Sequence, residues 1–314
     1  MILVSILMQV LLGILLTALV YYVFLRVTNR AQLIKDPAIG YDNKTSTLVI
    51  DGRADGGTLA SLTFDTVNPS STNFVKLAKS LNLKGGAQFS YSMWMMIRDS
   101  SLNLDGRVIL LRGDAKTYRV KKTNLSTNMT SLEPFHVKCP LIRFGTRDGD
   151  GVMSFGVEFN AVNEPDTRIS IKPNNQVQDT TLHRNLWSLL NKNWMLVSFV
   201  FSDHVAIDDF EDGIEVSVYI NDVKYASERK RDMFVQNNGH LHLFTDTDVA
   251  ATGNQGAANG VAIANLTYHN FALNPIDLRG ILGKGVPQHG YKGRDFKAQP
   301  LYLSEYNKLD TYNA

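Results

Sequence analysis

The chain has 314 residues, of which 32 are basic and 30 are acidic, so that its formal net charge is +2. A charge this close to zero does not favour nucleic acid as the main partner. A composition with 44% hydrophobic and 20% charged residues is typical of a folded domain and excludes a wholly disordered chain.

The first segment, Ile2 to Leu25, contains no Asp, Glu, Lys, Arg or His. As a helix it would be about 36 Å long, which is enough to cross a hydrocarbon core of about 30 Å. A signal peptide would have a shorter apolar run and a small-residue cleavage site, whereas this run ends in the bulky sequence YYVFLR. We therefore predict one retained transmembrane helix over residues 1–25.

Basic residues follow this predicted anchor, at Arg26, Arg30 and Lys35. Because positive flanks stay on the cytosolic side, we expect a single-pass membrane protein whose C-terminal part lies on the cytosolic face. Residues 26–44 are polar and are interpreted as a juxtamembrane linker. Four glycosylation sequons would matter only in a lumenal domain, and we interpret them as unused: Asn43, Asn124, Asn128 and Asn265.

Short strand patterns separated by turn residues begin after the linker. We predict strands at 46–52, 60–65, 88–97, 107–113, 139–145, 152–159, 167–172, 194–201, 214–220, 223–227, 240–244 and 260–270. Residues 74–83 are ambiguous between strand and helix, and residues 115–138 are interpreted as a polar insertion. Short helices are expected at 180–192 and after Asn274-Pro275. This pattern predicts an all-β protein, an antiparallel β-sandwich.

Two of these strands indicate where the core lies. In 88–97, Phe89, Tyr91, Met93 and Met95 share one face. The segment 194–201 is nearly all apolar, which predicts a strand covered on both faces.

Four pieces of sequence occur in a particular order: FSYSMWMMI, RVILLRGD, WMLVSFVF with IEVSVYINDVKYAS, and ANGVAIANLTYHNFALNPIDLRGILGKG. In this order, residues 45–285 resemble the laminin-G-like domain of the concanavalin A-like jelly-roll superfamily. The resemblance implies two antiparallel sheets packed face to face. Members of that family bind glycans, bind proteins or serve as structural modules, so the resemblance implies fold more than function.

The domain order is similar to that of membrane-associated virion proteins of large icosahedral DNA viruses, whose minor capsid proteins join an internal membrane to the outer shell. This similarity implies a non-enzymatic structural protein that contacts the lipid bilayer through residues 2–25 and also contacts other capsid or assembly proteins. It places the chain at the inner membrane and capsid of a virion. The alternative from a different class is a membrane-tethered, lectin-like glycan-binding module.

Catalytic and metal-binding patterns are weak. Glycoside hydrolases with this sandwich carry carboxylates at alternating strand positions, and no Glu-x-Asp-x-Glu occurs here, so we predict no catalytic residue and no enzymatic activity. The acidic segment 208–213 is interpreted as a solvated loop, with Ca²⁺ binding as the weaker alternative, and we expect no cofactor. His240 and His242 share a strand face and precede Asp246 and Asp248, but without a convincing third ligand we predict no metal site.

Three other short motifs have ordinary structural interpretations. Cys139, the only cysteine, excludes an internal disulfide and is expected to be a buried small hydrophobe. The tripeptide Arg112-Gly113-Asp114 is interpreted as a strand end with a turn, and the basic run 229–231 as a solvated turn.

Two groups of residues are candidate contact sites. The first group lies in the predicted insertion, carries positive charge and suits anionic lipid headgroups, with a solvated loop as the alternative: Lys116, Arg119, Lys121 and Lys122. The second group lies in the predicted extended tail, 286–314, and consists of aromatic residues that suit a partner's pockets: Tyr291, Phe296, Tyr302, Tyr306 and Tyr312. Packing of these aromatics on their own sandwich remains an equal alternative.

The expectation of protein contacts over sugar contacts rests on the strand aromatics. Trp94, Trp194, Phe199 and Phe201 lie in apolar runs, and we predict that they are buried. Buried rings cannot stack on a sugar.

Overall fold

The fold is taken from a computed structural model, which describes residues 44–55, 62–81, 86–98, 104–124, 129–145, 154–164, 166–172, 189–204, 213–245 and 260–292. The predicted anchor over residues 1–25 and nearly all of the linker lie outside these ranges. In the part of the chain that is described, no helix has both the length and the apolar character needed to cross a membrane. Thr45–Ala314 is one of two compact units and is considered by itself below.

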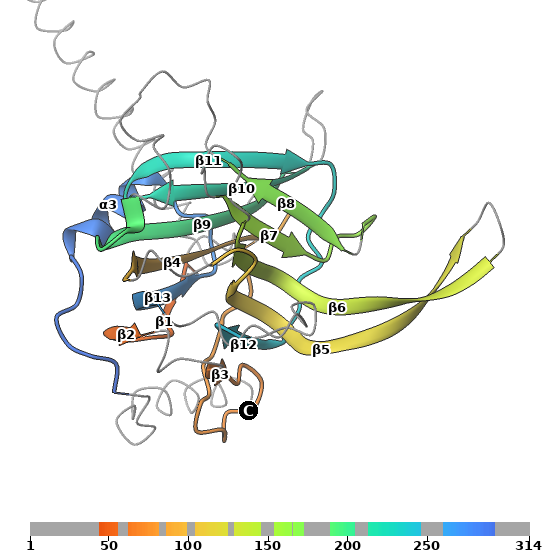
Figure 1. Cartoon of the computed structure of the whole chain (residues 1–314), viewed down its shortest axis with the longest axis horizontal. Helices are drawn as coiled ribbons and strands as arrows, with labels where there is room; N and C mark the ends of the chain where they lie inside the picture. Colours follow the sequence, from red (N-terminus) through yellow and green to blue (C-terminus); the bar gives the residue numbers. More distant parts are fainter. Residues whose placement is uncertain are drawn as a thin grey trace, which may run out of the picture. The chain divides into compact units, whose positions relative to one another are not determined.

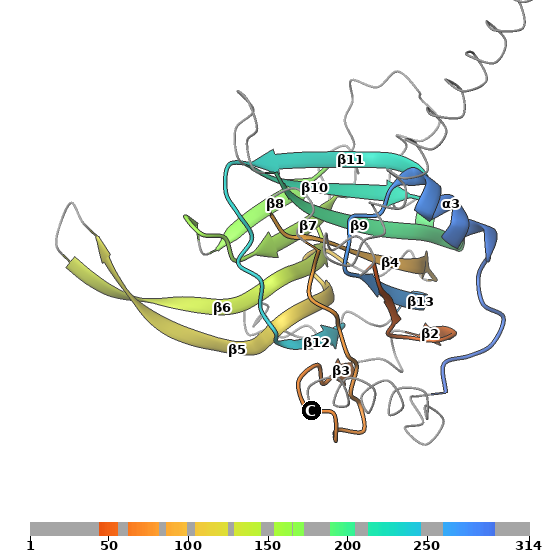
Figure 2. The same ribbon diagram turned by 180° about the vertical axis from the view of Figure 1, so that it is seen from behind.

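Two antiparallel sheets make up this unit (Figure 1; Figure 2 shows the reverse side). The first has the order β1-β13-β4-β9-β10-β11, and β2 also pairs with β13. Its strands are β1 (Ser46–Leu48), β2 (Arg53–Asp55), β4 (Gln88–Ile97), β9 (Met195–His204), β10 (Gly213–Ile220), β11 (Val223–Lys230) and β13 (Val261–His269).

The second sheet has the order β3-β12-β5-β6-β7-β8. Its strands are β3 (Leu62–Phe64), β12 (His240–Leu243), β5 (Val108–Asn124), β6 (Met129–Phe144), β7 (Phe155–Phe159) and β8 (Thr167–Ile171). The prediction of an all-β protein with two antiparallel sheets is therefore confirmed.

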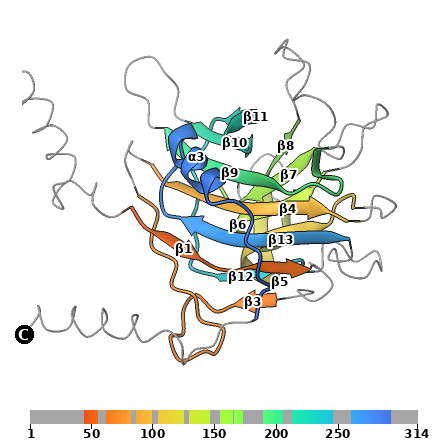
Figure 3. The ribbon, with the colours of Figure 1, turned by 90° about the vertical axis from the view of Figure 1, so that its left-hand side faces the viewer.

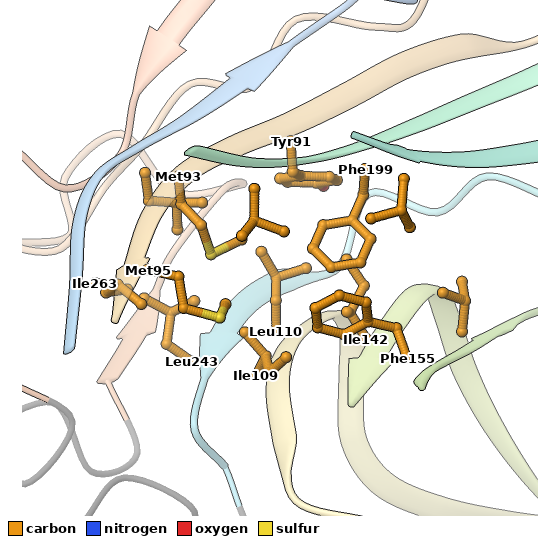
Figure 4. Packing of buried hydrophobic residues seen from close by; sticks show 14 of the residues in the cluster. Tyr91, Met93, Met95, Ile109, Leu110, Ile142, Phe155, Phe199, Leu243 and Ile263 are labelled. Atoms are coloured by element: carbon orange, nitrogen blue, oxygen red, sulfur yellow. The ribbon is translucent and has the colours of Figure 1, made fainter. Parts of the chain in front are cut away.

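The main core lies between the two sheets. Phe89, Tyr91, Met93 and Met95 of β4 are all buried in it, as their shared face predicts. Figure 4 shows Tyr91, Met93 and Met95 from the first sheet packed towards side chains of the second sheet, including Leu110, Ile142 and Phe155. Full burial of a side chain of this size contributes about 1.5–3 kcal/mol, so this interface provides most of the driving force for folding.

Strand β9 is covered on both faces, which confirms the prediction made from its apolar run. Val197, Phe199 and Phe201 lie in the main core. Leu196 and Val200 point to the outer side of the sheet, where they belong to a second apolar cluster with Trp94 and Leu278.

Leu278 comes from the α-helix α3 (Pro275–Gly283), which lies on the outer side of the first sheet (Figure 3). Its start follows from the sequence. Asn274 Oδ1 accepts hydrogen bonds from the backbone N–H groups of Ile276 and Asp277 at 2.8 and 2.9 Å, and the Asp277 carboxylate accepts from the Asn274 N–H at 3.1 Å. This reciprocal cap satisfies N–H groups that would otherwise lack partners, and Pro275 has the φ angle that a first helical residue needs.

Two segments differ from the predictions, and a third falls mostly outside the described residues. The predicted insertion at 115–138 is not a separate loop, because β5 continues to Asn124 and β6 begins at Met129. Residues 75–80 form neither a strand nor a helix, and only isolated bridges at Phe74 and Leu81 flank them. Of the predicted helix at 180–192, residues 180–188 lie outside the described ranges and only 189–190 are helical.

Candidate functional site

The most distinctive feature is the hairpin formed by β5 and β6. Strand β12 pairs with β5 only over Leu110–Gly113, and β7 pairs with β6 only over Leu141–Phe144. Further out, β5 and β6 pair with each other in register from Thr117 opposite His136 to Asn124 opposite Met129. We call residues 117–124 and 129–136 the arm. No other described strand pairs with the arm, and it runs out past its neighbours in Figures 1 and 2.

A bulge at Gly113 connects the arm to the sandwich. Three residues of β5, 114–116, stand opposite the single residue Val137 of β6. Gly113 has φ +152°, and a Cβ atom built on it would lie 1.8 Å from the Val137 carbonyl oxygen. Only glycine fits this close approach. A bulge bends and twists the strand that contains it, so the backbone at Gly113 sets the direction of the arm.

Buried charges fix the base of the arm on the β6 side. Lys138 is 2% exposed, and its Nζ forms an ion pair with Glu158, which is also 2% exposed, and a second ion pair with Asp166 at 2.6 Å. Arg143 Nη2 lies 2.6 Å from the other oxygen of Glu158. Burial acts to raise the pKa of Asp166, but the hydrogen bond and charge of Lys138 hold that pKa below its usual value.

Removing one member of such a buried network leaves an unpaired buried charge, which costs several kcal/mol. The network therefore holds β6 against β7 at the point where the arm begins. Sequence reasoning missed it, because Glu158 and Asp166 lie 20 and 28 positions from Lys138. They come together only because β6 pairs with β7 and β7 pairs with β8 in the sheet.

The four predicted lipid-contact residues all belong to β5. Lys116 lies in the bulge, and Arg119, Lys121 and Lys122 stand opposite Pro134, Leu132 and Ser131. The one acidic residue of the arm, Glu133, is on β6. The basic residues are thus gathered on one strand of the arm, and their contact with lipid stays a prediction. Alternation in TYRVKKTN and the turn-forming residues that follow it could have indicated the hairpin from sequence.

The beginning of the predicted tail packs on its own sandwich. The Arg53 N–H donates to the His289 carbonyl at 2.9 Å, and the Tyr291 N–H donates to the Arg53 carbonyl at 2.7 Å, so that residues 289–291 run parallel to β2. Tyr291 is half-buried against the main core. At this position the self-packing alternative is observed. Phe296, Tyr302, Tyr306 and Tyr312 lie outside the described residues, and their role as partner contacts stays a prediction.

Cys139 and the Arg112-Gly113-Asp114 tripeptide are both accounted for by packing within the fold. Burial raises the pKa of the Cys139 thiol to about 12, as expected for an inert buried residue. The Arg112 side chain is buried beneath the Tyr268 ring, 5.3 Å from its centroid, so the Arg-Gly-Asp tripeptide cannot present it to a receptor.

His242 is nearly buried, with Nδ1 3.0 Å from the Thr63 hydroxyl, while Asp246 and Asp248 lie outside the described ranges. The described residues contain no group of three or more potential metal ligands. The candidate Ca²⁺ loop before Gly213 is not described.

The strand aromatics are mostly buried, as predicted. Trp94, Phe199 and Phe201 are at most 6% exposed, whereas Trp194 is half-buried with the Arg53 guanidinium 5.6 Å from its ring centroid. Among the residues whose burial is described, which leave out 115–136, the large exposed hydrophobic residues are all aliphatic: Leu48, Val67, Val162, Val223, Val235 and Ile276. Outside the arm and its bulge, the described residues therefore offer no fully exposed aromatic ring for a sugar to stack on.

Searches with family models and among curated proteins find no match to this chain. Among solved structures, domain 4 of the extracellular GH43 arabinanase AbnA from Geobacillus stearothermophilus, in complex with arabinotriose, is 15% identical; the match covers 65% of this chain and 68% of that one, with a TM-score of 0.34. The receptor binding domain of botulinum neurotoxin C/D mosaic serotype is 11% identical, with 77% and 47% covered and a TM-score of 0.38.

The binding domain of botulinum neurotoxin serotype D is 13% identical, again with 77% and 47% covered and a TM-score of 0.37. The chain thus spans about half the length of these toxin domains. Similarities with TM-scores this low carry no conclusion about function.

Proposed function

We propose that this chain is a membrane-anchored structural protein whose sandwich binds partner proteins on the cytosolic face of the membrane. The arm is the observation that carries this proposal. A two-stranded hairpin is only marginally stable alone in water, and unpaired strand edges readily accept another chain. An arm of this kind, held by a buried ionic network at its base, suits a protein contact.

The finer proposal is a minor capsid protein that links an internal viral membrane to the shell of a large DNA virus. It is supported by the predicted anchor at 1–25 and by the similar domain order of membrane-associated virion proteins. In this arrangement, the anchor holds the chain in the inner membrane while the arm and the residues beyond 292 reach the neighbouring capsid proteins.

We further propose that the protein is not an enzyme. The most deeply buried described carboxylates are already engaged: Glu158 by Lys138 and Arg143, and Asp203 by the backbone N–H groups of Ala87 and Phe234. Both carboxylates are 2% exposed and bonded within the fold, so neither is available to a substrate in solution.

Protein contacts are favoured over the glycan-binding alternative, because outside residues 115–136 the large exposed hydrophobic side chains of the described residues include no aromatic ring on which a sugar could stack. An array of defined glycans tests this choice. Binding of one glycan at micromolar concentration, unchanged when the arm is shortened, would favour the lectin-like module instead.

The decisive experiment shortens the arm. Joining Thr117 to His136 through Asn-Gly removes the arm beyond this cross-strand pair and supplies a turn that fits antiparallel strands. The shortened chain should keep its cooperative unfolding transition but fail to enter the native assembly in purified particles or membranes. Normal incorporation of the shortened chain would contradict the proposal.

A second truncation tests the tail separately. The cut belongs after residue 292, because an earlier cut would remove the contacts of His289 and Tyr291 with β2. Deletion of residues 293–314 should leave the unfolding transition unchanged and weaken assembly if the four remaining aromatic residues bind a partner.

Membrane orientation is tested by glycosidase treatment of protein made in eukaryotic cells. Asn265 is a poor acceptor because its Oδ1 accepts from the Gly52 N–H at 2.9 Å and its own N–H donates to the Gly52 carbonyl at 3.2 Å. Asn124, at the outer end of β5, is the informative sequon. No mobility shift is expected, and a shift that the Asn124→Gln variant abolishes would reverse the orientation.

A further inference from the structure

We infer that the outer edge of β5 in the arm binds an acidic, extended segment of a partner protein, which adds to the arm as a third strand. This inference rests on the proposed function and names the chemistry of the partner. The geometry supplies an edge: β5 pairs with β6 on one side from Thr117 to Asn124, and no described strand pairs with its other side.

The two edges of the arm are not equivalent. Strand β6 contains Pro134 in the middle of the paired region, opposite Arg119. Proline has no N–H to donate, and its presence is a common means of blocking an edge strand. Strand β5 has no proline between Thr117 and Asn124, so its backbone offers a complete row of donors and acceptors for strand addition.

Charge also separates the two edges. Within the arm, Arg119, Lys121 and Lys122 lie on β5 and the one acidic residue, Glu133, lies on β6; in the bulge, Asp114 and Lys116 of β5 offset each other in charge. A strand added to β5 would be in direct register with Arg119, Lys121 and Lys122. Opposite charges directly across a strand pair stabilise it, whereas like charges destabilise it, so the favoured partner segment is acidic. Ion pairs to the partner's acidic side chains and backbone hydrogen bonds to its main chain would together stabilise the added strand.

An anionic lipid surface could bind the same positive charge. A lipid surface, however, offers no strand to complete the row of backbone groups on β5. The absence of proline from β5 and its presence in β6 have no role at a membrane. The observations therefore favour protein over lipid.

The test uses the full chain in nanodiscs of neutral lipid and a labelled peptide of about eight residues that alternates Glu with Val. Fluorescence anisotropy should show binding that weakens about tenfold or more when both Arg119→Glu and Lys121→Glu are introduced. The double variant Lys76→Glu and Lys79→Glu makes the same charge change at exposed residues away from the arm and should bind as the unaltered chain does.

Backbone pairing is tested with the same peptide methylated on alternate backbone nitrogens, in both possible phases. One phase removes the N–H groups that face β5, and it should lose binding by about tenfold or more, while the other phase retains it. A Lys-Val peptide should not bind. Equal binding of both methylated peptides, or no arm-dependent binding of the unmethylated one, would overturn the inference.

Lipid binding is measured in parallel. The nanodisc-held chain, captured on beads, is exposed to fluorescent phosphatidylcholine vesicles containing about one-third phosphatidylserine. Arm-dependent retention of these vesicles without peptide binding would overturn strand addition in favour of a lipid contact. Loss of assembly in the shortened chain would still support the proposed function in that case, so failure of the inference and failure of the function remain distinguishable.

Discussion

His269 offers the sharpest test of how this fold depends on a buried polar group. It lies on β13 between β1 and β4 and is 4% exposed. Its Nδ1 is 2.7 Å from the Ser46 hydroxyl and its Nε2 is 2.8 Å from the Ser92 hydroxyl. Since a hydroxyl can donate or accept, the two serines satisfy both nitrogens of a neutral imidazole.

Protonation of His269 is opposed by its surroundings. Burial, together with the positive charge of Lys284, lowers the pKa of His269 from its ordinary 6.5 to about 4. Two serine hydroxyls could still accept from an imidazolium, so hydrogen bonding does not explain the lowered pKa. The cost comes from placing a charge where water cannot solvate it.

The sign of the pH dependence follows from this lowered pKa. The unfolded chain takes up the proton near pH 6.5 and the folded chain only near pH 4, so stability is fully present above pH 6.5 and is lost as the pH falls towards 4. At about 1.4 kcal/mol per pH unit, the loss between pH 7.5 and 4.5 is about 2.5 kcal/mol.

The perturbation is His269→Gln, whose amide can donate and accept but does not titrate. Urea unfolding of both proteins at several values between pH 7.5 and 4.5 gives the free energy of unfolding. The variant should be about 1–2 kcal/mol less stable at pH 7.5, because it loses part of its hydrogen bonding and packing. Its stability should then fall by about 2.5 kcal/mol less than that of the unaltered chain. Parallel pH profiles for the two proteins would refute the reasoning.

Three further predictions concern other buried groups, all measured by urea unfolding. Burial raises the pKa of Asp203 to about 6, so the folded chain binds this proton before the unfolded chain does; stability should rise as the pH falls from 6 to 4, and Asp203→Asn should remove that rise. Lys138→Met should lower the free energy of unfolding by about 3 kcal/mol, because the buried Glu158 carboxylate loses the positive charge of Lys138. Adding Glu158→Gln to this variant should restore part of the lost stability. If the two substitutions instead lower stability additively, the two residues are not coupled. Gly113→Ala should cost at least about 2 kcal/mol because its Cβ would overlap the Val137 carbonyl, whereas Gly280→Ala, where a Cβ meets nothing, should be neutral or stabilising.

The sequence by itself determined the fold class and much of the core. Alternation in β4 placed Phe89, Tyr91, Met93 and Met95 on one buried face, and the apolar run of β9 predicted cover on both sides. The cap of α3 could also be predicted from Asn274-Pro275. These features depend on residues close in sequence, where the period of a strand and the chemistry of a cap act directly.

The tertiary structure alone decided the arm and the contacts at its base, on which the proposed protein contact depends. The arm requires β5 and β6 to find their register across a bulge, and the Lys138 network requires β6 and β7 to lie side by side. Tyr291 packs against the core only because β2, more than 200 positions earlier, accepts residues 289–291 beside it. His269 reaches Ser46 and Ser92 for the same reason. Charged or polar side chains carry little local pattern of their own, so their partners are set by strand pairing between distant segments.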